Sequence, residues 1–211
     1  MSRYIDVPPV CQGRVPVNVR ARQREVTRAT LLGESRRLFA ARGYGAVSLS
    51  EIVAAAGVTK GALYHLFESK AELFRAVLEQ VQQEVARIVA ETADAEADPW
   101  TRFTAGCQAF LTASTAPDIQ RIMLVDGPAV LGWNEWRAMD EAGSGSHLAD
   151  VITELIDQGL IAPQPVAPLT HLLSGAMNEA ALWLAASGDP EAHLPDTRAA
   201  LARMLDALRL T

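Results

Sequence analysis

The 211-residue sequence predicts an all-α protein, with a three-helix unit near its start and a larger helical body after it. Alanine and leucine are abundant and aromatic residues make up only 6% of the chain. Alternating runs of valine, isoleucine and threonine, which indicate strands, are hard to find. Apolar residues instead recur three and four positions apart, as they do from Leu201 to Leu208. A hydrophobic content of 49% with 21% charged residues is that of an ordinary globular protein, so we expect helices and almost no sheet.

Charge is divided unevenly along the chain. The net charge is -6, but residues 1–75 carry 12 basic and 6 acidic side chains, whereas residues 76–211 carry 7 basic and 19 acidic ones. A basic end on an acidic body predicts that only the first third faces a polyanion such as DNA.

The two cysteines, Cys11 and Cys107, are far apart, and neither has neighbours at a metal-ligand spacing. We therefore expect two free thiols in a reducing cytosol, with no disulfide scaffold, no metal and no cofactor. No apolar run approaches the roughly 20 residues that span a bilayer, and the first residues lack the apolar segment of a signal peptide. These features predict a cytoplasmic protein that does not contact a membrane.

Three segments follow from the pattern of helices and breakers. Residues 1–20 contain three prolines and no helical period, which predicts a flexible arm whose arginines either contact phosphates or remain in solvent. Residues 21–68 form the expected DNA-binding unit, and residues 69–211 form the expected effector-binding and dimerisation body.

The stretch from Ser48 to Phe74 organises the rest of the chain. Ser48 and Glu51 form a capping box that starts a short helix at residues 49–56. Gly57 then supplies a left-handed turn, and Thr59 caps a second short helix at residues 59–67. Two short helices joined by a tight glycine turn predict a helix-turn-helix DNA reader.

Helices are expected on both sides of this motif. An amphipathic helix at residues 21–42 precedes it and ends at Gly43. After it, Ser69 and Glu72 form a second capping box, which opens a long helix at residues 70–93. Because this long helix leaves the basic third for the acidic body, it can transmit a tilt from one part to the other.

The body is expected to hold further helices separated by glycine-rich and proline-rich breaks. The breaks are predicted at GPAVLGW, APQPVAP and GDPEAHLP, and a kink or a loop at GSGS. The helices expected between them cover residues 100–115, 117–125, 134–161, 168–187 and 196–210.

The motif resembles the amino-terminal signature of the TetR family of transcriptional regulators. The matching residues are Ile52, Ala54, Ala56-Gly57-Val58, Gly61, Leu63-Tyr64, Phe67, Lys70 and Leu73. The resemblance covers about a quarter of the chain. It implies a homodimer that reads a palindromic operator in double-stranded DNA, and a helical body that binds a small apolar or amphipathic effector and thereby releases the DNA.

Carried onto this sequence, the family motif also implies a set of DNA-contacting residues. The long cationic side chain of Lys60 can reach base edges or a phosphate at the start of the reading helix. Tyr64 has the strongest alternative, which is to pack against the first helix. The implied DNA face consists of Ser48, Thr59, Lys60, Gly61, Tyr64, His65 and Lys70.

Bulky or polar residues on the expected inner faces of the body are candidates for an effector pocket, although each can also be ordinary core. Asn178 stands out, because an amide on an apolar helix needs a partner, which can be a ligand, a backbone group or the same residue of a dimer mate. The pocket candidates are Phe103, Cys107, Phe110, Met123, Trp136, Met139, His147, Met177 and Asn178.

The two terminal helices carry more apolar surface than one subunit needs, which predicts a dimer interface. Its expected residues are Leu172, Ala176, Trp183, Leu201, Met204, Leu205 and Leu208.

Two other functions remain open at the level of sequence. One is a DNA-binding dimer whose body binds no ligand, and the other is a helical enzyme or carrier that uses the apolar body as its site. The sequence contains no HExxH, GxSxG or SxxK motif and no glycine-rich phosphate loop, and its four histidines are scattered. We therefore expect a regulator and not an enzyme.

Overall fold

The computed structural model describes residues 19–210, and this part of the chain is helical without a β-strand, which confirms the predicted all-α class. A single isolated bridge joins Ile161 to Arg209. The predicted arm at residues 1–20 lies outside the described residues, apart from residues 19 and 20, which begin the first helix. Among the described residues, no helix is both long enough and apolar enough to cross a bilayer.

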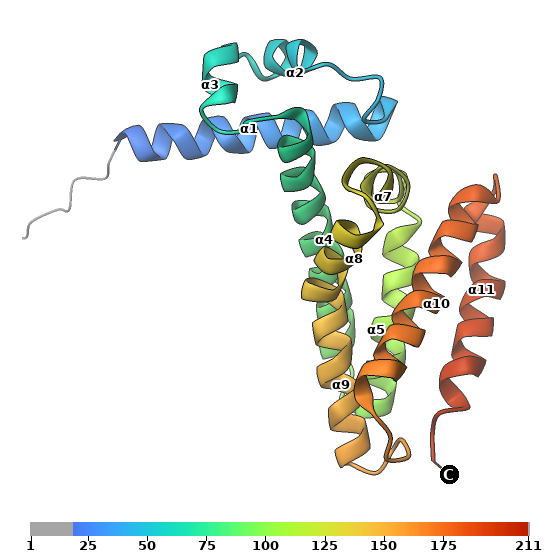
Figure 1. Cartoon of the computed structure of the whole chain (residues 1–211). Coiled ribbons are helices and arrows are strands. Elements are labelled where there is room, and N and C mark those ends of the chain that lie inside the picture. The colour runs from blue at the N-terminus through green and yellow to red at the C-terminus, as the bar shows by residue number, and fades with distance from the viewer. Residues whose placement is uncertain (1–18, 211) are drawn as a thin grey trace, which may run out of the picture.

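The molecule has a small head set across the end of an elongated helical body (Figure 1). The head contains α1 (Val19–Arg42), α2 (Leu49–Ala56) and α3 (Lys60–Tyr64), and α4 (Lys70–Asp94) runs from the head down through the body. The body continues with α5 (Pro99–Ser114), α6 (Pro117–Ile119), η1 (Gln120–Asp126), α7 (Gly127–Leu131), α8 (Trp133–Asp140), η2 (Glu141–Gly145), α9 (Ser146–Asp157), α10 (Val166–Ala186) and α11 (Pro190–Asp206).

Local sequence explains the helix ends of the head. The hydroxyl oxygen of Ser48 accepts a hydrogen bond from the backbone N–H of Glu51 at 3.2 Å, and the Glu51 carboxylate accepts one from the backbone N–H of Ser48 at 2.8 Å. Gly57 ends α2 with a φ of +63°, which is the left-handed region that favours glycine. The Thr59 hydroxyl then caps α3 by accepting from the backbone N–H of Ala62 at 3.1 Å.

Helix α3 is shorter than expected. It ends at Tyr64 instead of Phe67, because the chain turns there to place Phe67 in the core of the head, where its side chain is 3% exposed. Half of the second predicted capping box is present, because the Ser69 hydroxyl accepts from the backbone N–H of Glu72 at 3.1 Å at the start of α4. The Glu72 carboxylate accepts from the backbone N–H of Glu68 instead of that of Ser69.

Helix α4 belongs to two cores. Near its start, the Phe74 ring packs edge-on against the rings of Phe39 and Tyr44, with centroids 5.4 and 5.2 Å apart. Further along, Val81 and Val85 are buried in the body. The head and the body are therefore not independent units, since the same helix is part of both cores.

Several expected breaks are helical in the structure. GPAV continues the helix as α7, because Pro128 stands near its first position, where a missing N–H costs nothing, and the chain breaks only at Gly132 with a φ of +82°. GSGS forms part of the π-helical turn η2. Helix α11 begins at Pro190, six residues earlier than predicted, with Asp189 as its N-cap. Pro195 lies inside that helix.

We predict that Ser48→Ala lowers the free energy of unfolding by about 1 kcal/mol, because it removes the cap of α2. Ser50→Ala is the matched control, since Ser50 is exposed two residues further along the chain, inside the same helix, and no cap depends on it. Urea unfolding followed by circular dichroism measures both variants. Equal effects of the two substitutions would show that the capping box does not stabilise the folded head.

Candidate functional site

The outer face of α3 is exposed and polar. Leu63 points inward and is completely buried, whereas the side chains of Thr59, Lys60 and His65 are exposed. Tyr64 is 56% exposed, so more than half of its side chain is open to solvent. Gly61 adds no side chain to this face, and its backbone can approach a surface closely. Together these residues form a short helix face open to an incoming surface.

Ser48 lies at the start of α2 and is exposed. Its hydroxyl donates to the Glu51 carboxylate at 2.8 Å, and the Arg42 guanidinium donates to the same carboxylate at 2.7 Å. The hydrogen bond from the Ser48 backbone, followed by the one from Arg42, lowers the pKa of Glu51 to about 2. Glu51 is therefore ionised at neutral pH, but its charge is matched by Arg42, so the surface remains suited to a polyanion.

The side chain of Lys70, expected in the DNA face, contacts Tyr44 of its own subunit. Its ammonium group donates to the backbone carbonyl of Tyr44 at 2.5 Å and lies 4.0 Å from the centroid of the Tyr44 ring. Desolvation in this position lowers the pKa of Lys70. This contact holds the ammonium group against its own subunit, and a role of Lys70 in the DNA face stays a prediction.

The head is tied to the body by polar contacts from α1 and the corner after it. Arg36 of α1 donates to Asp118 of α6 at 2.6 Å and also pairs with Glu84 of α4. These contacts, with the hydrogen bond to Glu84 foremost, raise the pKa of Arg36. The backbone N–H of Tyr44 donates to Asp126 at the end of η1 at 2.8 Å. Because of these contacts, a movement of α4 or of the α6–η1 segment would change the position of the head.

The body encloses a cavity of about 570 Å³ between α4, α5 and α9, with η2 and α10 at one end. Phe103, Cys107, Phe110, His147 and Met177 line this cavity, so the structure brings together five of the predicted pocket residues. The burial of Cys107 raises the pKa of its thiol to about 12, which leaves it as a neutral apolar group at physiological pH. In the described part of the chain, no group of side chains could hold a metal ion.

The other predicted pocket residues lie behind the cavity wall. Trp136 is 1% exposed and its indole N–H donates to the backbone carbonyl of Met123 at 2.8 Å, so both residues serve the core. Met139 packs against the same core. Asn178 does not border the cavity and contacts a residue that does, Asp140.

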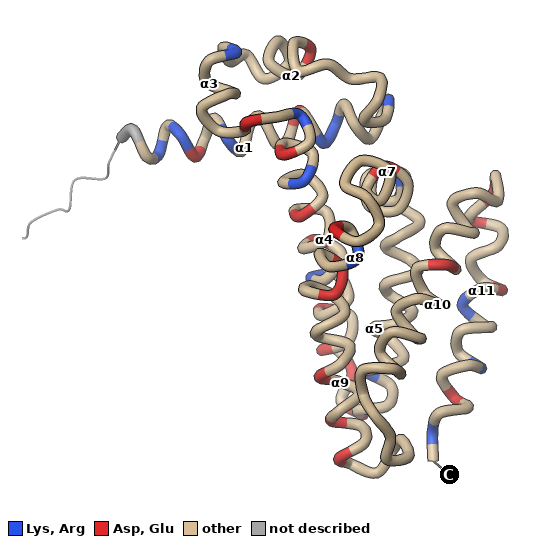
Figure 2. The backbone as a smooth tube through the Cα atoms, in the orientation of Figure 1, with Lys and Arg blue, Asp and Glu red and all other residues tan. Residues whose placement is uncertain are grey.

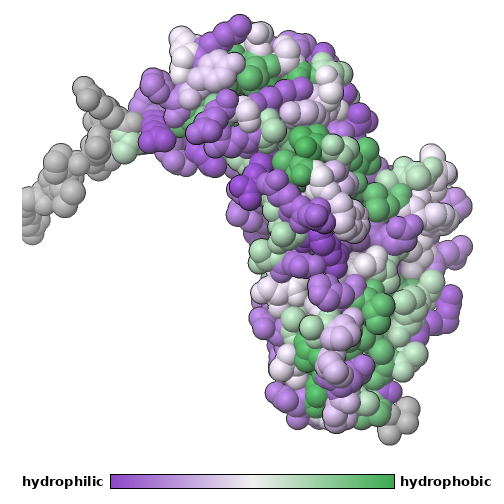
Figure 3. Space-filling view, viewed as in Figure 1, coloured by the Kyte–Doolittle hydropathy of each residue, from purple (hydrophilic) through white to green (hydrophobic). Residues whose placement is uncertain are grey.

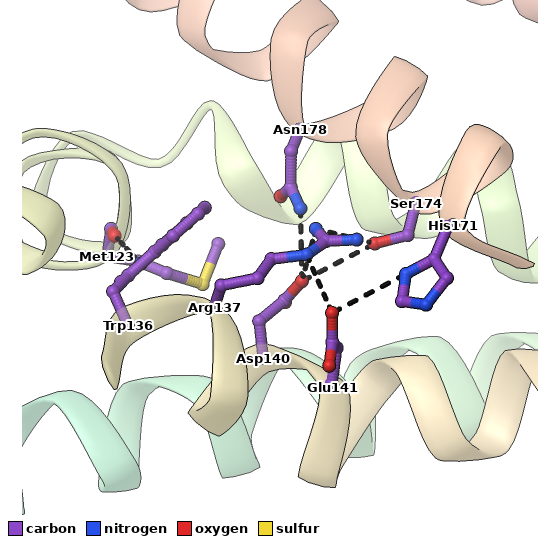
Figure 4. Close-up of polar contacts among 8 residues, drawn as sticks. All are labelled: Met123, Trp136, Arg137, Asp140, Glu141, His171, Ser174 and Asn178. Carbon is purple, nitrogen blue, oxygen red and sulfur yellow. Dashed lines mark hydrogen bonds and ion pairs between the residues drawn. The ribbon is translucent and has the colours of Figure 1, made fainter. Parts of the chain in front are cut away.

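Asp140 is the centre of a buried polar cluster that the sequence reasoning missed (Figure 4). Its Oδ2 atom accepts hydrogen bonds from Arg137 at 3.3 Å, Ser174 at 3.4 Å and Asn178 at 3.1 Å. The partner of the Asn178 amide is thus a carboxylate of its own subunit. Desolvation raises the pKa of Asp140. Its position four residues after the buried Trp136, on the same helix face, is the signal that indicates an inward carboxylate.

The predicted dimer residues divide into two groups. Leu172, Trp183 and Met204 are 71%, 51% and 51% exposed, and Ala176 and Leu208 are partly exposed. Leu201 and Leu205 are 6% and 0% exposed and pack in the core of their own subunit, which corrects their assignment to an interface. Hydrophobic patches are visible on the body over the region of α10 (Figure 3).

The fold and the exposed α3 define a helix-turn-helix DNA-binding regulator with a ligand-sized cavity in its body. Lys and Arg positions occur along the head, and Asp and Glu positions are frequent along α4 and α9 (Figure 2). Residues 31–77 match the family described as "Bacterial regulatory proteins, tetR family", and residues 100–208 match "Tetracyclin repressor-like, C-terminal domain". The chain belongs to the TetR family of DNA-binding transcriptional regulators. Regulators of this family bind DNA and act as dimers.

Individual proteins resemble the chain over most of its length. The crystal structure of a TetR-family transcriptional regulator from Pectobacterium atrosepticum is 36% identical, with a TM-score of 0.79 over 90% of this chain and 97% of that one. The transposon Tn10 TetC protein of Escherichia coli is 26% identical over 149 residues, which are 71% of this chain and 75% of TetC. The fold is also that of RolR crystallised with resorcinol, at 20% identity and a TM-score of 0.68 over 87% of this chain and 89% of RolR.

We predict that Lys60→Ala reduces DNA affinity by roughly tenfold or more, because it removes an exposed cation from the predicted DNA face. Thermal unfolding should be unchanged, since Lys60 makes no contact that supports the fold. Lys70→Ala is the contrasting variant. It should destabilise the protein by about 1 kcal/mol through the loss of its contacts with Tyr44. Fluorescence anisotropy with labelled DNA and thermal melting separate the two effects. A melting loss for Lys60→Ala as large as its binding loss would contradict its assigned role.

Proposed function

We propose that this regulator is a repressor that is released from a palindromic operator by a small effector bound in the cavity of its body. The observation that carries this proposal is that the cavity is walled by α4, the same helix that enters the core of the head. A ligand that alters the packing of α4 therefore acts on the position of α3. Operator binding would take place in the cytoplasm, where such DNA lies.

The mechanism would be a shift between two arrangements of the dimer. In one, the two α3 helices are spaced for successive major grooves, which lie about 34 Å apart. The effector binds better to the other arrangement and so weakens operator binding by the same coupling free energy. Within one subunit, the Phe74 contacts and the Arg36 ion pairs with Glu84 and Asp118 would carry the displacement to the head.

The size and lining of the cavity support an effector of low molecular mass. A volume of about 570 Å³ lies within the range of about 300 to 1,000 Å³ in which drug-sized molecules bind. The RolR structure, which has the same fold, is a complex with the ligand resorcinol, so a protein of this fold can bind a small organic molecule.

We expect the purified protein to retard a DNA fragment from the region upstream of its own coding sequence, at concentrations at which a random fragment of equal length stays free. The comparison is made at moderate salt, because low salt strengthens non-specific phosphate contacts. Lys60→Ala serves as the control for binding through α3. Equal retardation of both fragments at moderate salt would contradict a sequence-specific operator function.

We also propose that the exposed apolar residues of α10 and α11 form the dimer interface, and we predict opposite results for two neighbouring substitutions. Met204→Glu should convert the dimer to a monomer at micromolar concentration while the subunit stays folded, because Met204 is exposed. Leu205→Glu should instead lower the free energy of unfolding by more than about 3 kcal/mol, because it buries a charge in the core. Analytical ultracentrifugation and urea unfolding distinguish these outcomes. A stable dimer of Met204→Glu would place the interface elsewhere.

A further inference from the structure

The cavity has chemically different ends. Helices α4 and α5 run in opposite directions (Figure 1), and a Cβ added at Gly106 of α5 would lie 3.5 Å from Val89 and 3.6 Å from Ala93 of α4. In this register Arg102 lies toward the Asp94 end of α4. Phe110 lies about two helical turns further along α5, toward Ala86 of α4. The stretch between them is lined by apolar side chains, among them Phe103, Cys107 and Met177.

The end of the cavity beside Asp140, its inner end, presents a carboxylate oxygen that can accept a hydrogen bond. All three donors to Asp140 bind its Oδ2 atom, and no described residue donates a hydrogen bond to Oδ1. Asn178 lies behind the cavity wall, and its carbonyl oxygen is buried without a hydrogen-bond partner among the described residues. Because Asp140 lines the cavity, its Oδ1 atom can bind a ligand that supplies an N–H donor.

The charges of the cluster are also incompletely balanced. Arg137 contributes one positive charge and shares it between Asp140 at 3.3 Å and Glu141 at 3.1 Å. His171 is the other basic group there, with its Nδ1 atom 3.5 Å from Glu141, but it is exposed and lies on the side of Glu141 away from Asp140 (Figure 4). Apart from the exposed His171, two carboxylates share one guanidinium, so this cluster has one more acidic than basic group, which a ligand cation could match.

The remaining ionisable groups of the cavity add to this preference. Three further carboxylates, Asp94, Asp150 and Glu154, line it, against the basic Arg102 and His147. Arg102 lies near Asp94 at the end far from Asp140, and its buried Nε atom has no partner among the described residues. The inner end therefore attracts a positive group, while the far end offers a donor to a ligand acceptor.

We propose that the effector cavity takes a hydrophobic organic cation that carries N–H donors, such as a protonated aryl-alkyl amine or an amidine. Its positive group binds the free oxygen of Asp140 next to Asn178, and its apolar part lies between α4 and α5 against Phe103 and Phe110. This inference rests on the proposed effector function of the cavity and adds the chemical class of the ligand. The ligand supplies the charge and the donors that the subunit leaves unmatched.

The test compares three molecules of one shape and different charge: 2-naphthylmethylamine, 2-naphthylmethanol and 2-naphthoate. Isothermal titration of the full-length protein at neutral pH should show the amine binding at least roughly tenfold more tightly than the alcohol, because a charge-assisted hydrogen bond to a buried carboxylate exceeds a neutral one. The naphthoate should bind most weakly. Equal binding of amine and alcohol, or no binding of any of the three at millimolar concentration, would overturn the proposal.

Two matched variants locate the positive group. Asp140→Asn keeps the shape of the side chain and should reduce amine binding to the level of the alcohol, while binding of the alcohol stays unchanged. Asp150→Asn removes an exposed carboxylate of the same cavity and should change amine affinity by less than about threefold, because solvent screens it. An amine preference that survives Asp140→Asn would overturn the role of Asp140. If Asp140→Asn does not fold, the comparison of the three molecules on the unaltered protein decides the ligand class.

The outcome is separable from that of the operator experiment, since the titration contains no DNA. Failure of the amine with intact operator binding rejects this ligand class and leaves the regulator function standing. Tight binding of the amine without its releasing the operator fragment supports the ligand class and rejects effector control.

Discussion

The packing of Phe74 against Phe39 and Tyr44 is the contact on which the rest of the structure depends. It anchors the first turns of α4 in the head, and a stiff helix then carries that anchor through the core of the body. Aromatic pairs at these separations favour edge-on geometry, which restricts rotation of α4 about its axis. Because one helix serves both cores, the orientation of α3 is coupled to whatever packs against the lower part of α4.

The contacts around this anchor make the coupling specific. Lys70 is bound to Tyr44 from within α4, Arg36 connects α1 to α4 and α6, and Asp126 accepts the backbone N–H of Tyr44. None of these contacts contributes much to the stability of the fold alone, since part-exposed ion pairs contribute only about 0 to 1 kcal/mol each. Their effect is positional, because they hold the corner after α1 against the start of α4 and against the segment that follows α5.

The helix-turn-helix unit of the head was largely predictable because it depends on local rules. A serine or threonine at a helix start and a glycine at a helix end act over a few residues, and the polar positions of α3 follow from its short period. The cavity was predictable in part. Phe103, Cys107 and Phe110 share one face of α5, whereas Asp140 was missed because a carboxylate in a helix is ordinarily exposed, and its burial depends on Ser174 and Asn178, more than 30 residues away in the chain.

The sequence by itself determined the helical class, the capped helices of the head, the glycine turn and the division between a basic head and an acidic body. These properties are set mainly by neighbouring residues or by composition, so they could be predicted without knowledge of distant contacts. The tertiary structure alone decided which faces are covered. The periodicity of α11 marks Leu201, Met204, Leu205 and Leu208 alike, but Leu205 meets the core while Met204 meets solvent. A helical period shows which residues share a face, but it does not show what packs against that face. The contact of the Lys70 ammonium group could not be predicted for a similar reason, because only the fold brings Tyr44, 26 residues earlier in the chain, next to it.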